Sequence, residues 1–142
     1  MTQFHAGAIG ISFEAVVDMN DYQYHFMQLG LTSASVGKVA VGTGGSNPYP
    51  IGVLQNDPKI NSTADVTLFG PTLLRVNACG STINAGRLLK CGSTGHGEPF
   101  DYASVLAGSA LNANAIALDY TTDDDVIIEA FINPYMACVA GS

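Results

Sequence analysis

The sequence predicts an all-β protein, mainly antiparallel and compact, built as a small β-barrel, a sandwich or a β-tulip-like domain with an extended N-terminal arm. Two observations lead to this fold class. Short apolar segments alternate with a period of two residues, whereas a helix has a period of 3.6. Sixteen glycines and six prolines separate these segments, and both residue types are typical of turns. Strand, turn and strand therefore follow one another along most of the chain.

Residues 125–133 give the clearest strand of the sequence. Side chains at even positions form a purely apolar face there, while those at odd positions form a face of mixed polarity. The apolar face comprises Val126, Ile128, Ala130 and Ile132, and the mixed face comprises Ile127, Glu129, Phe131 and Asn133. Leu73 and Met27 also fall opposite the better core positions of their strands. We expect closure of the sheet, together with neighbouring subunits, to cover this second face.

Seven further segments have strand character and are bounded by turn residues. They are residues 22–29, 37–41, 51–55, 64–69, 72–77, 87–91 and 115–119. Gly70 and Pro71 are expected to separate two of these strands in a hairpin-like step, because glycine frees the backbone and proline lacks an N–H donor. Helix is expected only at residues 102–112, where alanine, leucine and serine permit about two or three turns.

The chain of 142 residues is long enough for one domain with a hydrophobic core of its own. Residues 1–18 contain small and apolar residues without a firm period, so we expect an arm that becomes ordered on another surface. Residues 19–133 are expected to form the β-domain, and residues 134–142 a shorter C-terminal tail.

The composition restricts the classes of partner. Hydrophobic residues make up 47% of the chain and charged residues only 12%, where an ordinary soluble domain has roughly a quarter charged. The net charge of −7 repels phosphate backbones, so we expect no nucleic-acid partner. No apolar stretch approaches the roughly 20 residues of a membrane-spanning helix, and no signal-peptide pattern is present. We therefore expect a soluble protein that is not secreted by that route and has no membrane partner.

Three cysteines, Cys79, Cys91 and Cys138, lie far apart without a C-x-x-C pair or a zinc-like spacing of histidines. We expect buried free thiols, because free cysteine behaves as a small core hydrophobe. A bridge between Cys79 and Cys91 is the alternative.

No set of residues predicts catalysis or a cofactor. His5, His25 and His96 lie in the arm, a strand and a glycine-rich loop, and His25 is expected to be a half-buried sheet residue between Tyr24 and Phe26. Neither the G-x-S-x-G turn of hydrolases nor a phosphate-binding glycine loop is present. We expect no enzyme activity, no catalytic residue and no bound cofactor.

The sharpest charge feature is a cluster of acids near the C-terminal end. It consists of Asp119, Asp123, Asp124, Asp125 and Glu129. Calcium prefers several converging carboxylates, but this spacing lacks the glycine of an EF-hand loop. We expect a solvated acidic loop at Asp123–Asp125 with no metal, and the same acids also suit a partner's lysine or arginine.

Several segments, taken in order, carry a resemblance to a known family. They are residues 23–29 (QYHFMQL), 50–58 (PIGVLQNDP), 64–70 (ADVTLFG), 74–76 (LRV), 83–89 (INAGRLL) and 125–132 (DVIIEAFI). In this order they resemble the capsid cement or head decoration family of tailed phages, over about residues 20–133. Both ends of the chain and residues 42–48 and 100–114 depart from the family's pattern.

The resemblance implies a structural virion protein of small β-rich fold, without catalytic residues. Such a protein is added to the outer surface of the expanded capsid in the virion, where it cements neighbouring major capsid subunits. Its expected partners are the major capsid protein and itself, as a homotrimer at threefold positions or a dimer at twofold positions. The alternative function is a small-ligand or carbohydrate-binding β-barrel module on the virion, which requires a concave site with aromatic residues.

Overall fold

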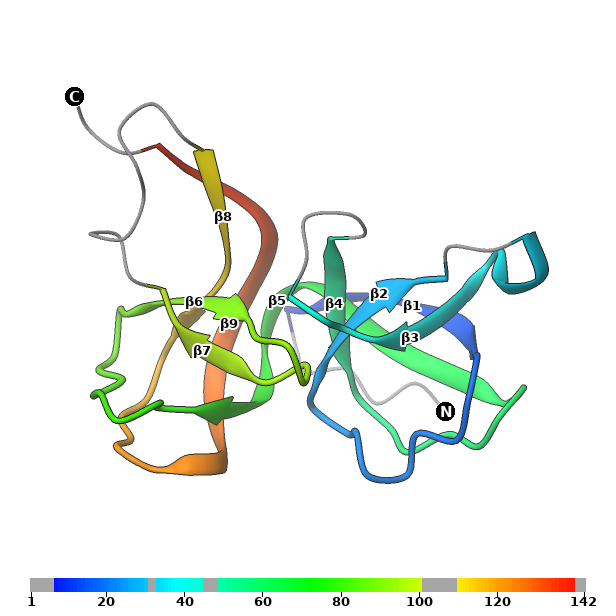
Figure 1. Cartoon of the computed structure of the whole chain (residues 1–142), viewed down its shortest axis with the longest axis horizontal. Coiled ribbons are helices and arrows are strands. Elements are labelled where there is room, and N and C mark those ends of the chain that lie inside the picture. Colours follow the sequence, from blue (N-terminus) through cyan, green and yellow to red (C-terminus); the bar gives the residue numbers. More distant parts are fainter. Residues whose placement is uncertain (1–6, 31–32, 45–48, 101–109, 140–142) are drawn as a thin grey trace.

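The structure is a computed structural model that describes residues 7–30, 33–44, 49–100 and 110–139. Within these residues it contains nine strands and one short 3-10 turn (Figure 1). The elements are β1 (Ile9–Ala15), β2 (Phe26–Leu29), η1 (Ser33–Ser35), β3 (Lys38–Val41), β4 (Pro50–Leu54), β5 (Thr63–Asn77), β6 (Leu88–Cys91), β7 (Gly97–Pro99), β8 (Ala110–Ala117) and β9 (Asp124–Val139). The all-β prediction is confirmed. So is the mainly antiparallel pairing, because only β1–β3 and β5–β7 run parallel among the pairings of the described strands.

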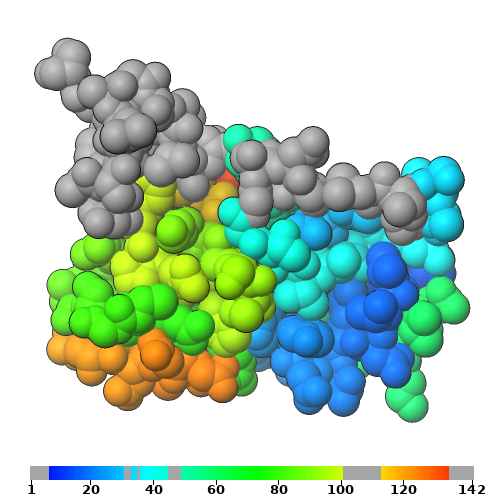
Figure 2. Space-filling view, in the orientation of Figure 1, coloured from blue at the N-terminus to red at the C-terminus, as the bar shows by residue number. Residues whose placement is uncertain are grey.

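The strands form one mixed sheet in the order β1-β3-β2-β4-β5-β7-β6-β8-β9. Two additional pairings, β1–β5 and β5–β9, bring each half of the sheet back to β5. The result is two rings of paired strands that share this long strand (Figure 1). We call β1–β4 with residues 63–69 of β5 the N-terminal lobe, and residues 70–77 of β5 with β6–β9 the C-terminal lobe. Figure 2 shows the lobes side by side, the N-terminal lobe in blue and cyan and the C-terminal lobe in green and orange.

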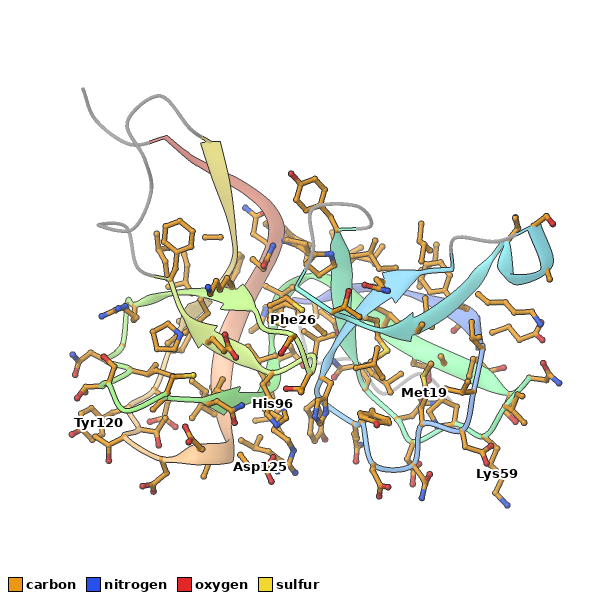
Figure 3. All side chains as sticks on the ribbon, in the orientation of Figure 1. Met19, Phe26, Lys59, His96, Tyr120 and Asp125 are labelled. Atoms are coloured by element: carbon orange, nitrogen blue, oxygen red, sulfur yellow. The ribbon has the colours of Figure 1, made fainter. Side chains whose placement is uncertain are left out.

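Each lobe encloses a hydrophobic core. The N-terminal core comprises Ala15, Met19, Met27, Val39, Ile51, Leu54, Ala64 and Val66. The C-terminal core is larger and comprises Phe26, Val53, Leu74, Val76, Ala78, Ile83, Leu89, Cys91, Ala115, Ala117, Ile128, Ala130 and Ile132. Phe26 and Val53 belong to strands of the N-terminal lobe but pack in the C-terminal core, and Figure 3 shows Phe26 at the junction. Met27, expected on a second and poorly covered face, is fully buried in the N-terminal core instead.

The expected break at Gly70 and Pro71 does not occur. Both residues lie inside β5, which runs continuously from Thr63 to Asn77. Gly70 has a φ of +110°, and a Cβ atom there would lie 2.8 Å from the Cα of Ala8. Glycine therefore lets the strand pass from one lobe to the other where residues 7 and 8 approach the backbone. Pro71 continues the ladder opposite Phe131 of β9.

The segments expected to lie outside the domain contribute strands to the sheet. Within residues 1–18, β1 pairs with both β5 and β3, although no period was visible in its sequence. The period is obscured because Ala15 is buried and Phe13 packs against the core, while Ile9 and Ile11 remain exposed. Within residues 134–142, residues 134–139 extend β9, and residues 136–139 pair with β8.

The expected helix at residues 102–112 lies mostly outside the described residues. Its last three residues, 110–112, are described and belong to β8, paired antiparallel with β9. For these three residues the helix prediction is wrong. Their strand partners supply tertiary hydrogen bonds that override the helix preference of alanine and leucine.

Candidate interaction surface and interlobe cluster

Strand β9 has the two faces expected from its alternation. Ile128, Ala130 and Ile132 are buried in the C-terminal core, whereas Ile127 is 41% exposed. Phe131 is half-buried, so the second face keeps apolar side chains at the surface. The prediction of a buried apolar face opposite a mixed face is therefore confirmed.

The mixed face of β9 continues onto its two neighbouring strands. In the registers of the sheet, Ile116 of β8 and Pro71 of β5 both lie opposite Phe131. The backbone N–H of Leu118 donates to the carbonyl of Glu129, which lies opposite Leu73 on β5. We call this surface the outer face; it consists of Phe69, Pro71, Leu73, Ile116, Leu118, Ile127, Glu129 and Phe131.

The outer face is apolar and locally ordered. The rings of Phe69 and Phe131 meet edge to face, with centroids 5.1 Å apart. Phe69 and Leu118 are 43% and 47% exposed, values typical of surface residues. Glu129 is the one charged residue in the set, and Arg75, which lies opposite Ile127 on β5, borders it. Contiguous apolar surface of this kind, unlike isolated exposed side chains, marks interaction sites in soluble proteins.

A second feature lies where the lobes meet. His25 precedes β2 in the N-terminal lobe and His96 precedes β7 in the C-terminal lobe, yet their rings are 4.5 Å apart. Tyr22 packs edge-on against His25 at 5.3 Å. His25 is buried in a turn just before β2, so the expectation of a half-buried strand residue is wrong. His5 lies outside the described residues.

Hydrogen bonds fix the C-terminal side of this junction. His96 Nε2 lies 3.0 Å from Asp125 Oδ1, and Thr94 Oγ1 lies 2.8 Å from His96 Nδ1. Arg75 Nη1 donates both to Asp125 Oδ1 at 3.2 Å and to the Asp125 carbonyl at 3.0 Å. The Asp125 N–H donates to Asn77 Oδ1 at 2.8 Å. These bonds hold Asp125 in a left-handed conformation, with a φ of +54°, that non-glycine residues adopt infrequently.

The arrangement lowers the pKa values of two side chains, His25 and Asp125. The first shift favours the neutral form of its group, and the second favours the charged form. Burial lowers the pKa of His25, and the nearby His96 and Arg75 lower it further. Hydrogen bonds from His96 and then Arg75 lower the pKa of Asp125. A neutral His25 and an ionised Asp125 are therefore favoured in the folded protein.

An open pocket of about 520 Å³ lies at the junction. It is lined by Asn20, Asp21, Tyr22, Gln23, His25, Arg75, His96 and Asp125. Figure 3 shows His96 and Asp125 at the lower centre, between the lobes, and Figure 2 shows the surface notched there between blue and orange segments. No sequence motif indicated this pocket, because its residues come from four separate segments.

The acidic residues of the C-terminal cluster do not converge. Asp119 accepts the N–H of Tyr120, Asp124 accepts the N–H of Cys79, and Asp125 faces His96. Within the described residues, no group of three or more histidines, cysteines or acids is placed to hold a metal ion. Nor does any helix there have the length and apolar character needed to cross a membrane.

Two of the three cysteines can be placed as thiols, and both are free. Cys91 is buried as expected, and burial raises its pKa to about 12. Cys79 is exposed, so the expectation of a buried thiol is wrong there, and so is the alternative of a Cys79–Cys91 bridge. Cys79 lies in the turn after β5, where its φ is +56°. The side chain of Cys138 lies outside the described part of the chain.

Together these observations define a two-lobed β-protein with an apolar outer face. No protein-family model and no curated protein matches the chain. Its fold is similar to the crystal structure of the N base of the head fiber gp8.5 of bacteriophage phi29, with a TM-score of 0.61. That comparison covers 90% of this chain and 96% of that chain at 15% sequence identity. The two chains share a fold over nearly their whole lengths.

Proposed function

We propose that this protein is a structural component of a phage virion, without enzyme activity. It binds the outer surface of the expanded capsid and cements neighbouring major capsid subunits. The observation that carries the proposal is the outer face of β5, β8 and β9, whose apolar side chains lie in registered rows at the surface. The shared fold with a phage head fiber base supports the same class of role.

The chemistry of the outer face suits a protein partner. A specific interface has an apolar core with few charged residues and a polar rim. Phe69 and Phe131 supply aromatic side chains, a type that is enriched in such interfaces. The net charge of −7 disfavours contact with DNA, which is consistent with a position outside the shell.

The required affinity favours several copies bound together. A virion component must survive dilution, which asks for nanomolar affinity, about 12 kcal/mol for each binding unit. A homotrimer at a threefold position reaches this more easily than one chain, because each further contact forms at high effective concentration. A dimer at a twofold position is the alternative. Sedimentation equilibrium distinguishes them by whether the mass is three or two times the 14.7 kDa of one chain.

The direct test uses expanded, undecorated heads and the purified protein. After mixing, the heads are washed in about 1 M salt, where the Debye length falls to roughly 3 Å, and the retained copies are counted. Apolar contacts are barely screened, so we expect retention at a fixed stoichiometry and heads that better resist heat. Complete release by salt, or equal binding to unexpanded shells, would reject the proposal.

A further inference from the structure

We propose that the interlobe pocket binds a neutral saccharide. Its volume of about 520 Å³ falls within the roughly 300–1,000 Å³ typical of small-molecule sites. Most such sites are lined by apolar side chains, whereas this one is lined mainly by amide, carboxylate, guanidinium and imidazole groups. A ligand that fills it must therefore present hydrogen-bonding groups over most of its surface.

The charges in the pocket favour a neutral ligand. Asp21 and Asp125 bring two carboxylates and Arg75 brings one guanidinium. Phosphate or sulfate groups are repelled by the carboxylates and by the net charge of −7. Arg75, which already binds Oδ1 of Asp125, offsets one of the two carboxylates and repels a second guanidinium or ammonium group. Hydroxyl groups, which both donate and accept, fit such a mixed set.

Several polar groups of the pocket are available to a ligand. Among the described residues, His96 and Arg75 both bind the Asp125 carboxylate at Oδ1, which leaves Oδ2 as an acceptor. The side chains of Asn20 and Asp21 are exposed and form no hydrogen bond or ion pair with the residues that the structure describes. Adjacent hydroxyl groups of a sugar match such neighbouring amide and carboxylate groups.

Aromatic surface and rigidity complete the site. Tyr22 is held against His25 but stays 38% exposed, which offers apolar surface to the C–H groups of a sugar ring. Asp125 is fixed by bonds from Arg75 and to Asn77 before any ligand arrives. A carboxylate fixed in advance loses little freedom on binding, which favours affinity.

The test is an NMR titration of the free protein. The probes are glucose, galactose, mannose, N-acetylglucosamine and their disaccharides, with inorganic phosphate and N-acetyl-lysinamide as charged comparisons. At least one neutral sugar should shift the resonances of Tyr22, His25 and His96 saturably, and neither charged probe should. Asn20→Ala and Tyr22→Ala should each weaken that sugar's binding roughly tenfold, by removing a hydrogen-bonding or apolar contact.

The matched controls are Tyr120→Ala and Asp119→Asn, which change exposed residues in the β8–β9 connection. Figure 3 shows Tyr120 far from His96 and Asp125 of the pocket. They should leave sugar binding unchanged. The inference is overturned if no neutral sugar shifts the pocket resonances, if a charged probe binds instead, or if the pocket and control variants weaken binding equally. Because no heads are present, failure here leaves the proposed capsid binding untouched.

Discussion

The two lobes bury their apolar residues in different ways. In the N-terminal lobe, β4 is buried at all five positions, because one side faces its own core and Val53 reaches the other. In the C-terminal lobe, β9 buries one face and leaves the second at the surface. The N-terminal lobe exposes large apolar residues both in loops, such as Val36 and Ile60, and on β1, such as Ile9 and Ile11. On β9, Ile127 and Phe131 share one face at the surface, so this strand presents aligned apolar side chains to a partner.

The lobes nevertheless share their packing and their backbone hydrogen bonds. The N–H of Phe26 donates to the Gly95 carbonyl at 2.7 Å, and the N–H of Arg75 donates to the Tyr24 carbonyl at 2.8 Å. Phe26 and Val53 fill part of the C-terminal core. We expect the two lobes to unfold together, as one cooperative unit.

Phe26→Ala should have the largest effect, because it removes a fully buried ring that lies between the lobes. We expect a loss of about 3–5 kcal/mol in the free energy of unfolding. Chemical denaturation, monitored separately in each lobe by NMR, measures it. Leu118→Ala, at an exposed site, is the control and should change stability by about 0.5 kcal/mol or less. Two separated transitions, with only one moved by Phe26→Ala, would show that the lobes are independent.

Gly70→Ala tests the strand shared by the lobes. An added Cβ meets the Ala8 backbone at 2.8 Å, at a φ that disfavours alanine. We expect a loss of about 2–5 kcal/mol from the combined clash and backbone strain. At Gly80, φ is +76° but no atom lies within 4 Å of an added Cβ, so Gly80→Ala should cost only about 1 kcal/mol. Equal losses at the two sites would mean that close approach at Gly70 contributes nothing.

These glycines also show what the sequence can and cannot predict. Gly70 and Pro71 have the local chemistry of a turn, yet the pairing of both halves of β5 keeps the strand continuous. Alternation predicts β9 correctly because only one of its faces is buried. The alternation is weak in β1, because the first residues of that strand are exposed, and in β4, because the second lobe buries its other face.

The two candidate sites also differ in how far the sequence predicts them. The apolar residues of the outer face could be predicted from the alternation at Ile127 and Phe131, because that pattern is local. The meeting of His25 with His96 could not, since 71 positions separate them in the sequence and only the closure of both lobes brings their rings together. The interlobe pocket depends on the same closure.

Acid should weaken the junction between the lobes. Because the pKa of His25 is lowered in the folded state, the unfolded chain binds more protons at pH values between the two pKa values. Stability should therefore fall as the pH drops below the ordinary imidazole pKa of 6.5, by at most about 1.4 kcal/mol per pH unit for one proton. The lowered pKa of Asp125 acts only below its ordinary value of 3.8. Denaturation curves between pH 5 and pH 8 measure the slope, and His25→Phe should flatten it; an unchanged slope would assign it to another group.

Thr67→Val should have the smallest effect, with the opposite sign. Thr67 Oγ1 is buried and has no hydrogen-bond partner among the described residues. Replacing the hydroxyl by a methyl group of similar shape removes an unsatisfied polar atom, so stability should rise by about 0–2 kcal/mol. A loss of stability in thermal denaturation would show that a partner or a bound water satisfies this oxygen.

Retention of outer-face variants on expanded heads tests the proposed capsid binding most directly. Ile127→Asp and Leu118→Asp change exposed residues of the outer face, and Ile60→Asp changes an exposed residue of the N-terminal lobe as the matched control. Each should leave the melting temperature of the free protein nearly unchanged. After a wash in high salt, we expect the two outer-face variants to bind about thirtyfold more weakly or worse, as hot-spot losses of about 2 kcal/mol imply, while Ile60→Asp is retained like the wild type. Full retention of both outer-face variants would contradict the assignment of capsid binding to this face.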